Sequence, residues 1–91
     1  MLKLNFSKKT AKFLHKIPQK HGQQIALKIQ SLQENPYPQD AKRLKGVLGN
    51  YTRVDSGEYR IIFELINDTI YLVLIGKRND DEVYRKLRNI H

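Results

Sequence analysis

The sequence predicts a single α+β domain, and three observations carry that prediction. Two amphipathic helical segments stand in the N-terminal third, three strand-like segments separated by tight turns follow, and a short charged helix closes the chain. Helices and strands that form separate runs, without alternating, are typical of an α+β fold with an antiparallel sheet. A chain of 91 residues has room for one hydrophobic core. We therefore expect residues 1–91 to form one domain.

The N-terminal third is predicted to hold an edge strand and two helices. Residues 2–6 alternate apolar and polar side chains, as a half-buried strand does. Ser7 is a good N-cap for a helix over residues 8–17, which Pro18 ends. A second helix, over residues 20–34, carries apolar side chains at helical spacing. Together the two helices are expected to form an αα-hairpin.

The rest of the chain is predicted to form an antiparallel three-stranded meander and a short C-terminal helix. The strands are expected over residues 51–54, 59–66 and 70–77, with turn-forming residues between them. The final helix is expected from about Asp81, because acidic residues stand at its start and basic residues later. The predicted order is therefore β-α-α-β-β-β-α.

The charge balance points to a polyanionic partner. Lysine and arginine number 17 against 9 acidic residues, which gives a net charge of +8. The first 33 residues hold seven lysines and no acid. Such an excess of positive charge favours binding to nucleic acid, although it would attract an acidic protein equally well. The lysines predicted to contact nucleic acid from the first helix are Lys8, Lys9 and Lys12.

Several classes of function have no support in the sequence. There is no cysteine, and no apolar run reaches the ~20 residues of a membrane span. The N-terminus lacks the pattern of a signal peptide, so a cytoplasmic protein with no membrane association is expected. No phosphate-binding loop, paired-carboxylate site or metal-ligand cluster is present, so we expect neither metal nor cofactor.

The predicted sheet gathers arginines. With a four-residue loop at 55–58, Val54 lies opposite Tyr59, and Arg53 lies opposite Arg60. The two arginines then share one face, with Cβ atoms about 5 Å apart. Like charges in that position are destabilising, and a bound phosphate would offset their repulsion.

The next hairpin adds to this group. In an antiparallel meander, the start of the strand at Arg60 lies beside the end of the next strand at Lys77 and Arg78. Tyr84 follows six residues after Arg78 on the closing helix and is expected near the same end. Guanidinium groups suit phosphate because their planar forks bind its oxygens bidentately. The sequence therefore predicts a phosphate-binding site at this end of the sheet.

Four short motifs, in this order, resemble the RelE/ParE toxin superfamily over nearly the full length of the chain. They are Leu44-Lys45-Gly46, Tyr59-Arg60-Ile61-Ile62-Phe63-Glu64, Gly76-Lys77-Arg78 and Glu82-Val83-Tyr84. The resemblance implies a RelE-like, microbial-RNase-like fold and the toxin of a type II toxin–antitoxin module. RelE-type toxins of the family are mRNA interferases, which enter the ribosomal A site and cut mRNA without a metal. The partners implied are a RelB-like antitoxin, the ribosome and mRNA.

The resemblance also implies roles for individual residues. Attack by the 2′-hydroxyl of the message on the scissile phosphate leaves a cyclic phosphate. Arg60 matches the arginine that stabilises the charged transition state, and Arg78 matches the one that contacts the scissile phosphate. Tyr84 matches the tyrosine that orients or stacks on the nucleotide, while Lys45 and Lys77 lie in motifs expected to bind RNA or ribosome.

One strand departs from the family pattern. Arg53 stands where the prototype has one of two lysines, and Tyr51 replaces the other in its Lys-x-Lys pattern. Asp55 stands where many relatives have a further basic residue. Arginine is a poor general base because it stays protonated. The base therefore remains open between Tyr84, Lys45 and no dedicated group.

Two other functions remain open. A ParE-like toxin has the same fold but poisons DNA gyrase, and loss of the lysine pair favours it. A non-catalytic RNA-binding module of the αβββα type is the other alternative, against which the two N-terminal helices argue.

Overall fold

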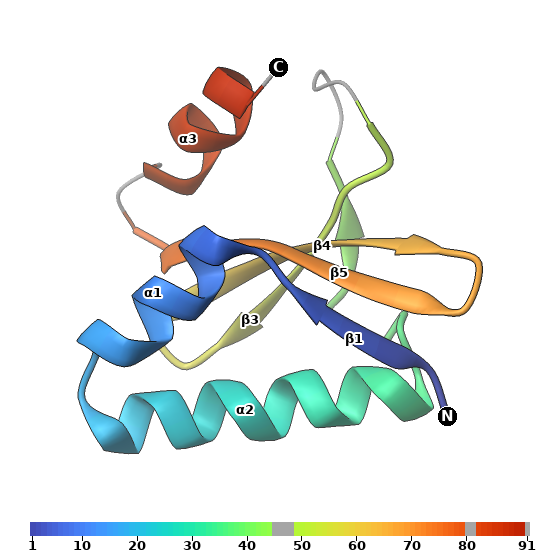
Figure 1. Cartoon of the computed structure of the whole chain (residues 1–91), viewed down its shortest axis with the longest axis horizontal. Coiled ribbons are helices and arrows are strands. Elements are labelled where there is room, and N and C mark those ends of the chain that lie inside the picture. The colour runs from blue at the N-terminus through green and yellow to red at the C-terminus, as the bar shows by residue number, and fades with distance from the viewer. Residues whose placement is uncertain (45–48, 80–81, 91) are drawn as a thin grey trace.

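The computed structural model describes residues 1–44, 49–79 and 82–90 and confirms the α+β fold (Figure 1). The predicted order is found with one addition, a two-residue strand before the meander. The elements are β1 (Lys3–Phe6), α1 (Lys8–Lys16), α2 (Gln19–Glu34), β2 (Lys42–Arg43), β3 (Thr52–Ser56), β4 (Tyr59–Ile66), β5 (Thr69–Lys77) and α3 (Glu82–Ile90). Among these described elements, no helix is long and apolar enough to cross a membrane.

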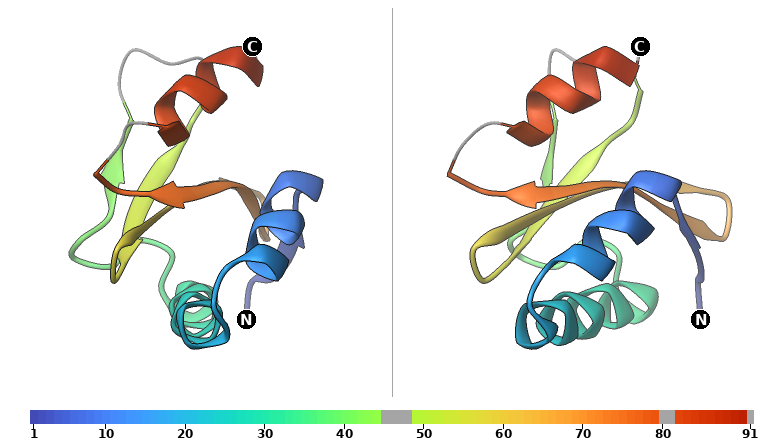
Figure 2. Two further views of the ribbon diagram at one scale, coloured as in Figure 1. Left: turned by 90° about the vertical axis from the view of Figure 1, so that its left-hand side faces the viewer. Right: turned by 60° about the vertical axis from the view of Figure 1, so that its left-hand side comes forward.

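The strands form one sheet in the order β1-β5-β4-β3-β2. β1 is an edge strand, as predicted, and pairs parallel to β5. β3, β4 and β5 form the predicted antiparallel meander with β4 in the centre. Helices α1 and α2 cover one face of the sheet, and α3 lies on the other (Figure 2).

The first helix begins where its capping residue predicts. The Ser7 hydroxyl oxygen accepts the Thr10 N–H at 3.1 Å, which satisfies one unpaired donor at the helix start. The same hydroxyl donates to the Val73 carbonyl oxygen at 2.8 Å and so ties the helix to β5. α1 ends at Lys16, one residue before the predicted end.

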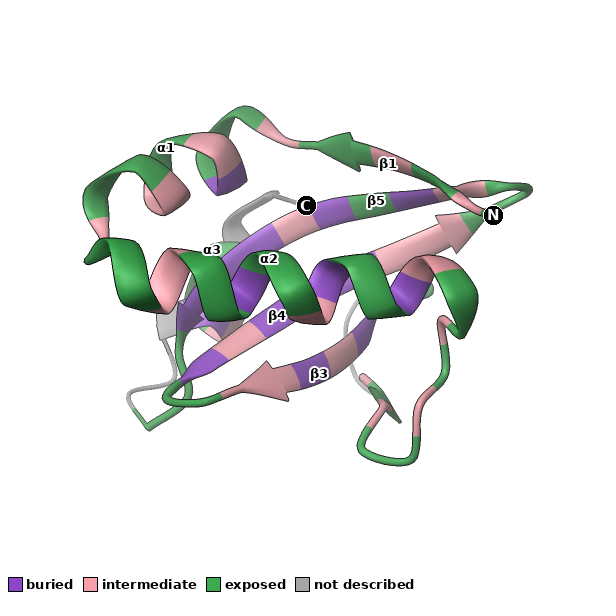
Figure 3. Cartoon of the chain, turned by 90° about the horizontal axis from the view of Figure 1, so that it is seen from below, coloured by how far each residue is buried: buried purple, intermediate pink, exposed green. Residues whose placement is uncertain are grey.

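The larger core lies between the sheet and the N-terminal helices. The α2 residues Ile25, Ile29 and Leu32 are buried against the sheet (Figure 3). From β4, Ile61 and Phe63 are fully buried in the same cluster. The apolar stripe of the helix and the apolar face of the strand therefore meet, as their periodicities predict.

A smaller core holds α3 against the opposite face of the sheet. Its buried members are Tyr51, Ile62, Leu74, Val83 and Leu87. Gly76 makes this contact possible, because a Cβ at that position would overlap Cγ2 of Val83. The glycine opposite Arg60 thus lets the start of α3 rest directly on β5.

Candidate active site

The hairpin between β3 and β4 corrects the predicted register. Its turn has two residues, Gly57 and Glu58, and Asp55 pairs with Arg60 while Arg53 pairs with Ile62. The prediction that Arg53 lies directly opposite Arg60 is therefore wrong. Gly57 adopts a φ of +59°, a conformation that two-residue hairpin turns need and that glycine takes at no steric cost.

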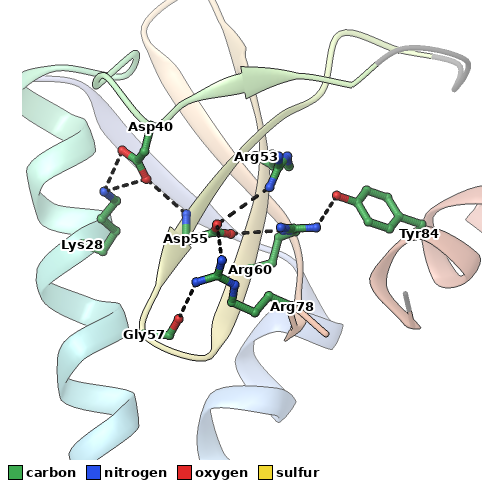
Figure 4. A network of polar contacts seen from close by, with 8 residues as sticks. All are labelled: Lys28, Asp40, Arg53, Asp55, Gly57, Arg60, Arg78 and Tyr84. Atoms are coloured by element: carbon green, nitrogen blue, oxygen red, sulfur yellow. Dashed lines mark hydrogen bonds and ion pairs between the residues drawn. The ribbon is translucent and has the colours of Figure 1, made fainter. Parts of the chain in front are cut away.

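The carboxylate of Asp55 takes the place that the sequence assigns to a bound phosphate. Its Oδ1 accepts a hydrogen bond from Nε of Arg60 at 3.1 Å (Figure 4). Its Oδ2 lies 3.7 Å from Nη1 of Arg53 and 4.0 Å from Nη2 of Arg78. We call Arg53, Arg60 and Arg78 the arginine cluster. It lies on the face of the sheet that α3 covers, since Arg60 and Ile62 alternate with Ile61 along β4.

The three arginines come from different parts of the sheet. Arg60 and Arg53 project from paired strands, and their side chains are 14% and 20% exposed. Arg78 follows the end of β5, and its backbone N–H donates to the Glu58 carbonyl oxygen at 2.9 Å. Its side chain is 52% exposed, and its Nη1 also donates to the Gly57 carbonyl oxygen at 3.5 Å. The cluster therefore has two mostly buried members on strands and one member open to solvent.

Tyr84 of α3 closes one side of the cluster. Nη1 of Arg60 donates to the Tyr84 hydroxyl oxygen at 2.6 Å, and the guanidinium carbon lies 5.6 Å from the ring centroid. Partial burial alone lowers the pKa of Arg60, but the hydrogen bond and negative charge of Asp55, together with the electrostatic attraction and hydrogen bond of the Tyr84 oxygen, outweigh it. The pKa is therefore raised, and Arg60 stays cationic.

The lysines predicted to bind RNA, where the structure describes them, lie outside the arginine cluster. Lys77 pairs with Tyr59, which faces the larger core, and it lines a hollow of about 320 Å³ with Arg78 and the Gly57–Glu58 turn. Lys8 is exposed on α1. A groove of about 360 Å³ is lined by Lys9, Lys12, Phe13, Lys16, Leu74, Ile75 and Lys86. Lys45 lies outside the described residues.

Tyr51 explains the departure from the lysine pair. Its side chain is 6% exposed and packs with Ile62 and Leu74 beneath α3. Burial and the nearby charge of Glu64 raise the pKa of Tyr51. This position therefore supports the smaller core, and Arg53 alone carries positive charge from the strand into the site.

A second carboxylate, which the sequence analysis missed, supports the arginine cluster from outside. Oδ2 of Asp40 accepts the backbone N–H of Asp55 at 3.3 Å, and Asp40 also pairs with Lys28 of α2 at 3.0 Å. Burial raises the pKa of Asp40, but the hydrogen bonds and the Lys28 charge outweigh this effect and lower it overall. Asp40 precedes β2 in a turn, where a lone aspartate gives no signal in the sequence.

The described residues bring no three histidine, cysteine or carboxylate side chains together as a metal site. The site that they do form is cationic, with one internal carboxylate and one phenol. Such a site can hold a phosphate or a carboxylate, since the two parallel N–H groups of a guanidinium fork match two oxygens of either anion.

Comparisons with known proteins agree with this fold. Residues 4–82 match the family described as the ParE toxin of the type II toxin–antitoxin system, parDE. No curated protein matched the chain at a significant level of sequence similarity.

Three solved structures illustrate the likeness. The isolated E. coli RelE toxin is 20% identical with a TM-score of 0.74, and the match covers 100% of both chains. The archaeal RelE–RelB complex from Pyrococcus horikoshii OT3 gives 21% identity and a TM-score of 0.76, covering 87% of this chain and 97% of that one. The RelB–RelE antitoxin–toxin complex from Methanococcus jannaschii gives 30% identity and a TM-score of 0.69, covering 88% and 96%.

These matches define a toxin of a type II toxin–antitoxin system with a RelE-like fold. The chain belongs to the ParE toxin family, within the RelE/ParE superfamily.

Proposed function

We propose that the chain is a ribosome-dependent endoribonuclease that cuts mRNA in the ribosomal A site. The observation that carries the proposal is the arginine cluster, gathered on one face of the sheet with Tyr84 beside Arg60. Charge grows on the phosphate during RNA cleavage by a neighbouring hydroxyl. Cations already fixed on strands stabilise that charge without reorganising when it appears.

In the proposed reaction, the 2′-oxygen of the message bonds to the adjacent phosphorus and the bond to the 5′-oxygen breaks. A proton leaves the 2′-hydroxyl and another is taken up by the 5′-oxygen, which leaves a cyclic phosphate. Arg60 stabilises the added negative charge, with Arg53 beside it. Arg78, the exposed member, contacts the scissile phosphate and supports the leaving oxygen. Tyr84 orients the nucleotide or stacks on it.

We assign general binding to the lysines. Lys8, Lys9 and Lys12 are exposed on α1, where long side chains attract phosphates without fixing their position. Lys77 lies beside Arg78 and extends the positive surface at the end of the sheet. Lys45, outside the described residues, is assigned the same role. These contacts would act on ribosomal RNA or mRNA.

Primer extension on an mRNA that is being translated tests the proposal. We expect new 5′-ends within codons only when ribosomes and the toxin are both present. Cutting of naked mRNA at the same sites, or no cutting at all, would contradict it. Binding to RNA without cleavage would instead favour a non-catalytic RNA-binding module.

A gyrase-poisoning toxin of the ParE type is the second candidate. Burial of Tyr51 in place of a site lysine supports it, as does the family description of the sequence match. A DNA supercoiling assay with purified gyrase separates the two functions. Inhibition of supercoiling without mRNA cutting would favour this candidate.

We further propose that a RelB-like antitoxin silences the toxin in the cytoplasm. The groove between α1, β5 and α3 supports this, because lysines surround an apolar floor formed by Phe13, Leu74 and Ile75. A segment rich in acidic and apolar side chains would suit such a surface. Expression of the toxin alone should arrest growth, and co-expression of the antitoxin should restore it. Unaffected growth on induction of the toxin alone would contradict the proposal.

A further inference from the structure

Asp55 is the common partner of the arginine cluster. One carboxylate oxygen bonds to Arg60, and the other lies within ion-pair distance of Arg53 and Arg78. A carboxylate in this position offsets part of the repulsion among three guanidiniums. It also occupies the Nε donor of Arg60, which would otherwise be presented to a phosphate.

The carboxylate is held there by the backbone as well as by charge. Asp55 lies in β3, directly paired with Arg60 of β4. Its N–H donates to Asp40, which is itself fixed to α2 through Lys28 (Figure 4). The main chain of Asp55 therefore stays in place, and only its side-chain torsions can take the carboxylate away from the arginines.

A phosphate and this carboxylate compete for the same edge of Arg60. A bidentate contact uses two parallel N–H groups of a guanidinium, and Nε of Arg60 already donates to Asp55. If both anions stayed, two negative groups would share one site, which disfavours their joint presence. The carboxylate must rotate away for phosphate to bind along this edge.

We propose that Asp55 is an internal anion that competes with phosphate for the arginine cluster and thereby sets the phosphate affinity of the site. This inference rests on the proposed function only in assuming that the cluster binds the phosphates of RNA. Free phosphate binds weakly, since it must displace the carboxylate unaided. A phosphate that other contacts already position at the cluster displaces it more readily.

The test compares two variants with the same change in net charge. Asp55→Asn removes the internal anion and keeps the side-chain shape. Asp68→Asn is the control, because Asp68 lies in the β4–β5 turn, is exposed and pairs only with Lys3 among the ion pairs described. Binding of inorganic phosphate and of a 2′-deoxy-substituted, uncleavable RNA oligonucleotide is titrated at fixed salt.

We expect Asp55→Asn to tighten binding of both probes by about tenfold, because one charge within about 4–6 Å of another shifts an ionic equilibrium by roughly one log unit or more. Asp68→Asn should change either affinity by no more than about twofold, since an exposed charge far from the site acts only through a screened field. Equal effects of the two variants, or weaker binding by Asp55→Asn, would overturn the proposal.

A measurement on the unchanged protein covers the case in which Asp55→Asn does not fold. Saturating phosphate should shift the NMR signals of the Arg60 Nε–H group and of the Asp55 carboxyl carbon together. Phosphate binding that shifts the arginine signal and leaves the Asp55 carboxyl signal unchanged would overturn the proposal. If the predicted gain in phosphate binding is found but mRNA is not cut on ribosomes, the nuclease proposal fails and the role of Asp55 stands.

Discussion

Replacement of Gly76 by alanine should push the start of α3 away from the sheet and disturb the site without changing any polar residue. An added Cβ would lie well under 3.0 Å from Cγ2 of Val83, where ordinary contacts fall at 3.4–4 Å. Valine cannot relieve the overlap easily, because its branched side chain is stiff. We therefore expect the start of α3 to retreat by roughly 1 Å, the distance that restores normal contact.

The cost of this retreat follows from what α3 buries. Val83 and Leu87 are 2% and 0% exposed in the smaller core. Overpacking at such a site costs about 1–3 kcal/mol, and each kcal/mol lowers the Tm of a domain of this size by about 4–8 °C. The hydrogen bond between Arg60 and Tyr84 should be lost as the helix moves. Thermal unfolding and mRNA cleavage on ribosomes measure the two effects.

Gly22→Ala is the matched control for this substitution. Gly22 lies within α2, and a Cβ there would meet nothing closer than the Leu14 carbonyl oxygen at 4.0 Å. The free energy of unfolding should rise by about 0.5–1 kcal/mol, since alanine is the better helix former. If Gly76→Ala is as stable and active as Gly22→Ala, the close contact of α3 with β5 at Gly76 is contradicted.

Three further predictions concern the surroundings of the site. Asp40→Asn should lower the free energy of unfolding near neutral pH, because the folded-state pKa of Asp40 is depressed. The difference in unfolding free energy from wild type should shrink as the pH falls below 3.8, the ordinary pKa of the group. Urea unfolding repeated over this pH range would contradict the ion pair if the difference stayed constant. Tyr84→Phe removes the acceptor of Arg60 and should cost about 1 kcal/mol in thermal unfolding, whereas an unchanged Tm would mean that the bond contributes nothing. The logarithm of RNA affinity should fall linearly with the logarithm of salt concentration. Cleavage should survive a chelator once the magnesium requirement of the ribosome is controlled for, and a need for a transition metal would refute the metal-free mechanism.

The sequence predicts the long elements well, because the spacing of apolar residues repeats several times along each of them. The strand predicted at residues 59–66 is found at those bounds, and the turn at Asn67 and Asp68 is found where predicted. The strand at Lys42–Arg43 cannot be predicted from hydrophobic periodicity, since two residues are too few to show a repeat. The strand expected at 51–54 extends from Thr52 to Ser56 for a related reason, because its end depends on the turn that follows.

The site shows why a correct fold does not fix the contacts within it. Residues 55–58, where the sequence predicts the turn, are aspartate, serine, glycine and glutamate, and the first three of these favour turns. The two-residue turn that forms changes the partner of Arg60 from Arg53 to Asp55. Composition identifies a turn, whereas its length decides the register. The arginines still meet, because all three lie near one end of the meander whichever loop is chosen.

The most direct test of the account is single-turnover mRNA cleavage on ribosomes by Arg60→Ala and by the double variant Lys8→Ala with Lys9→Ala. Arg60 is held on a strand between Asp55 and Tyr84, whereas the two lysines are exposed on α1. Removal of one preorganised donor lowers a catalytic rate by about 10²-fold or more, so the cleavage rate of Arg60→Ala should fall by at least that factor. Arg60→Lys should recover little of this rate, because an ammonium lacks the planar fork. The double lysine variant should bind ribosomes somewhat less tightly and cut at nearly the wild-type rate. Wild-type cutting by Arg60→Ala, together with an inactive double lysine variant, would contradict the account.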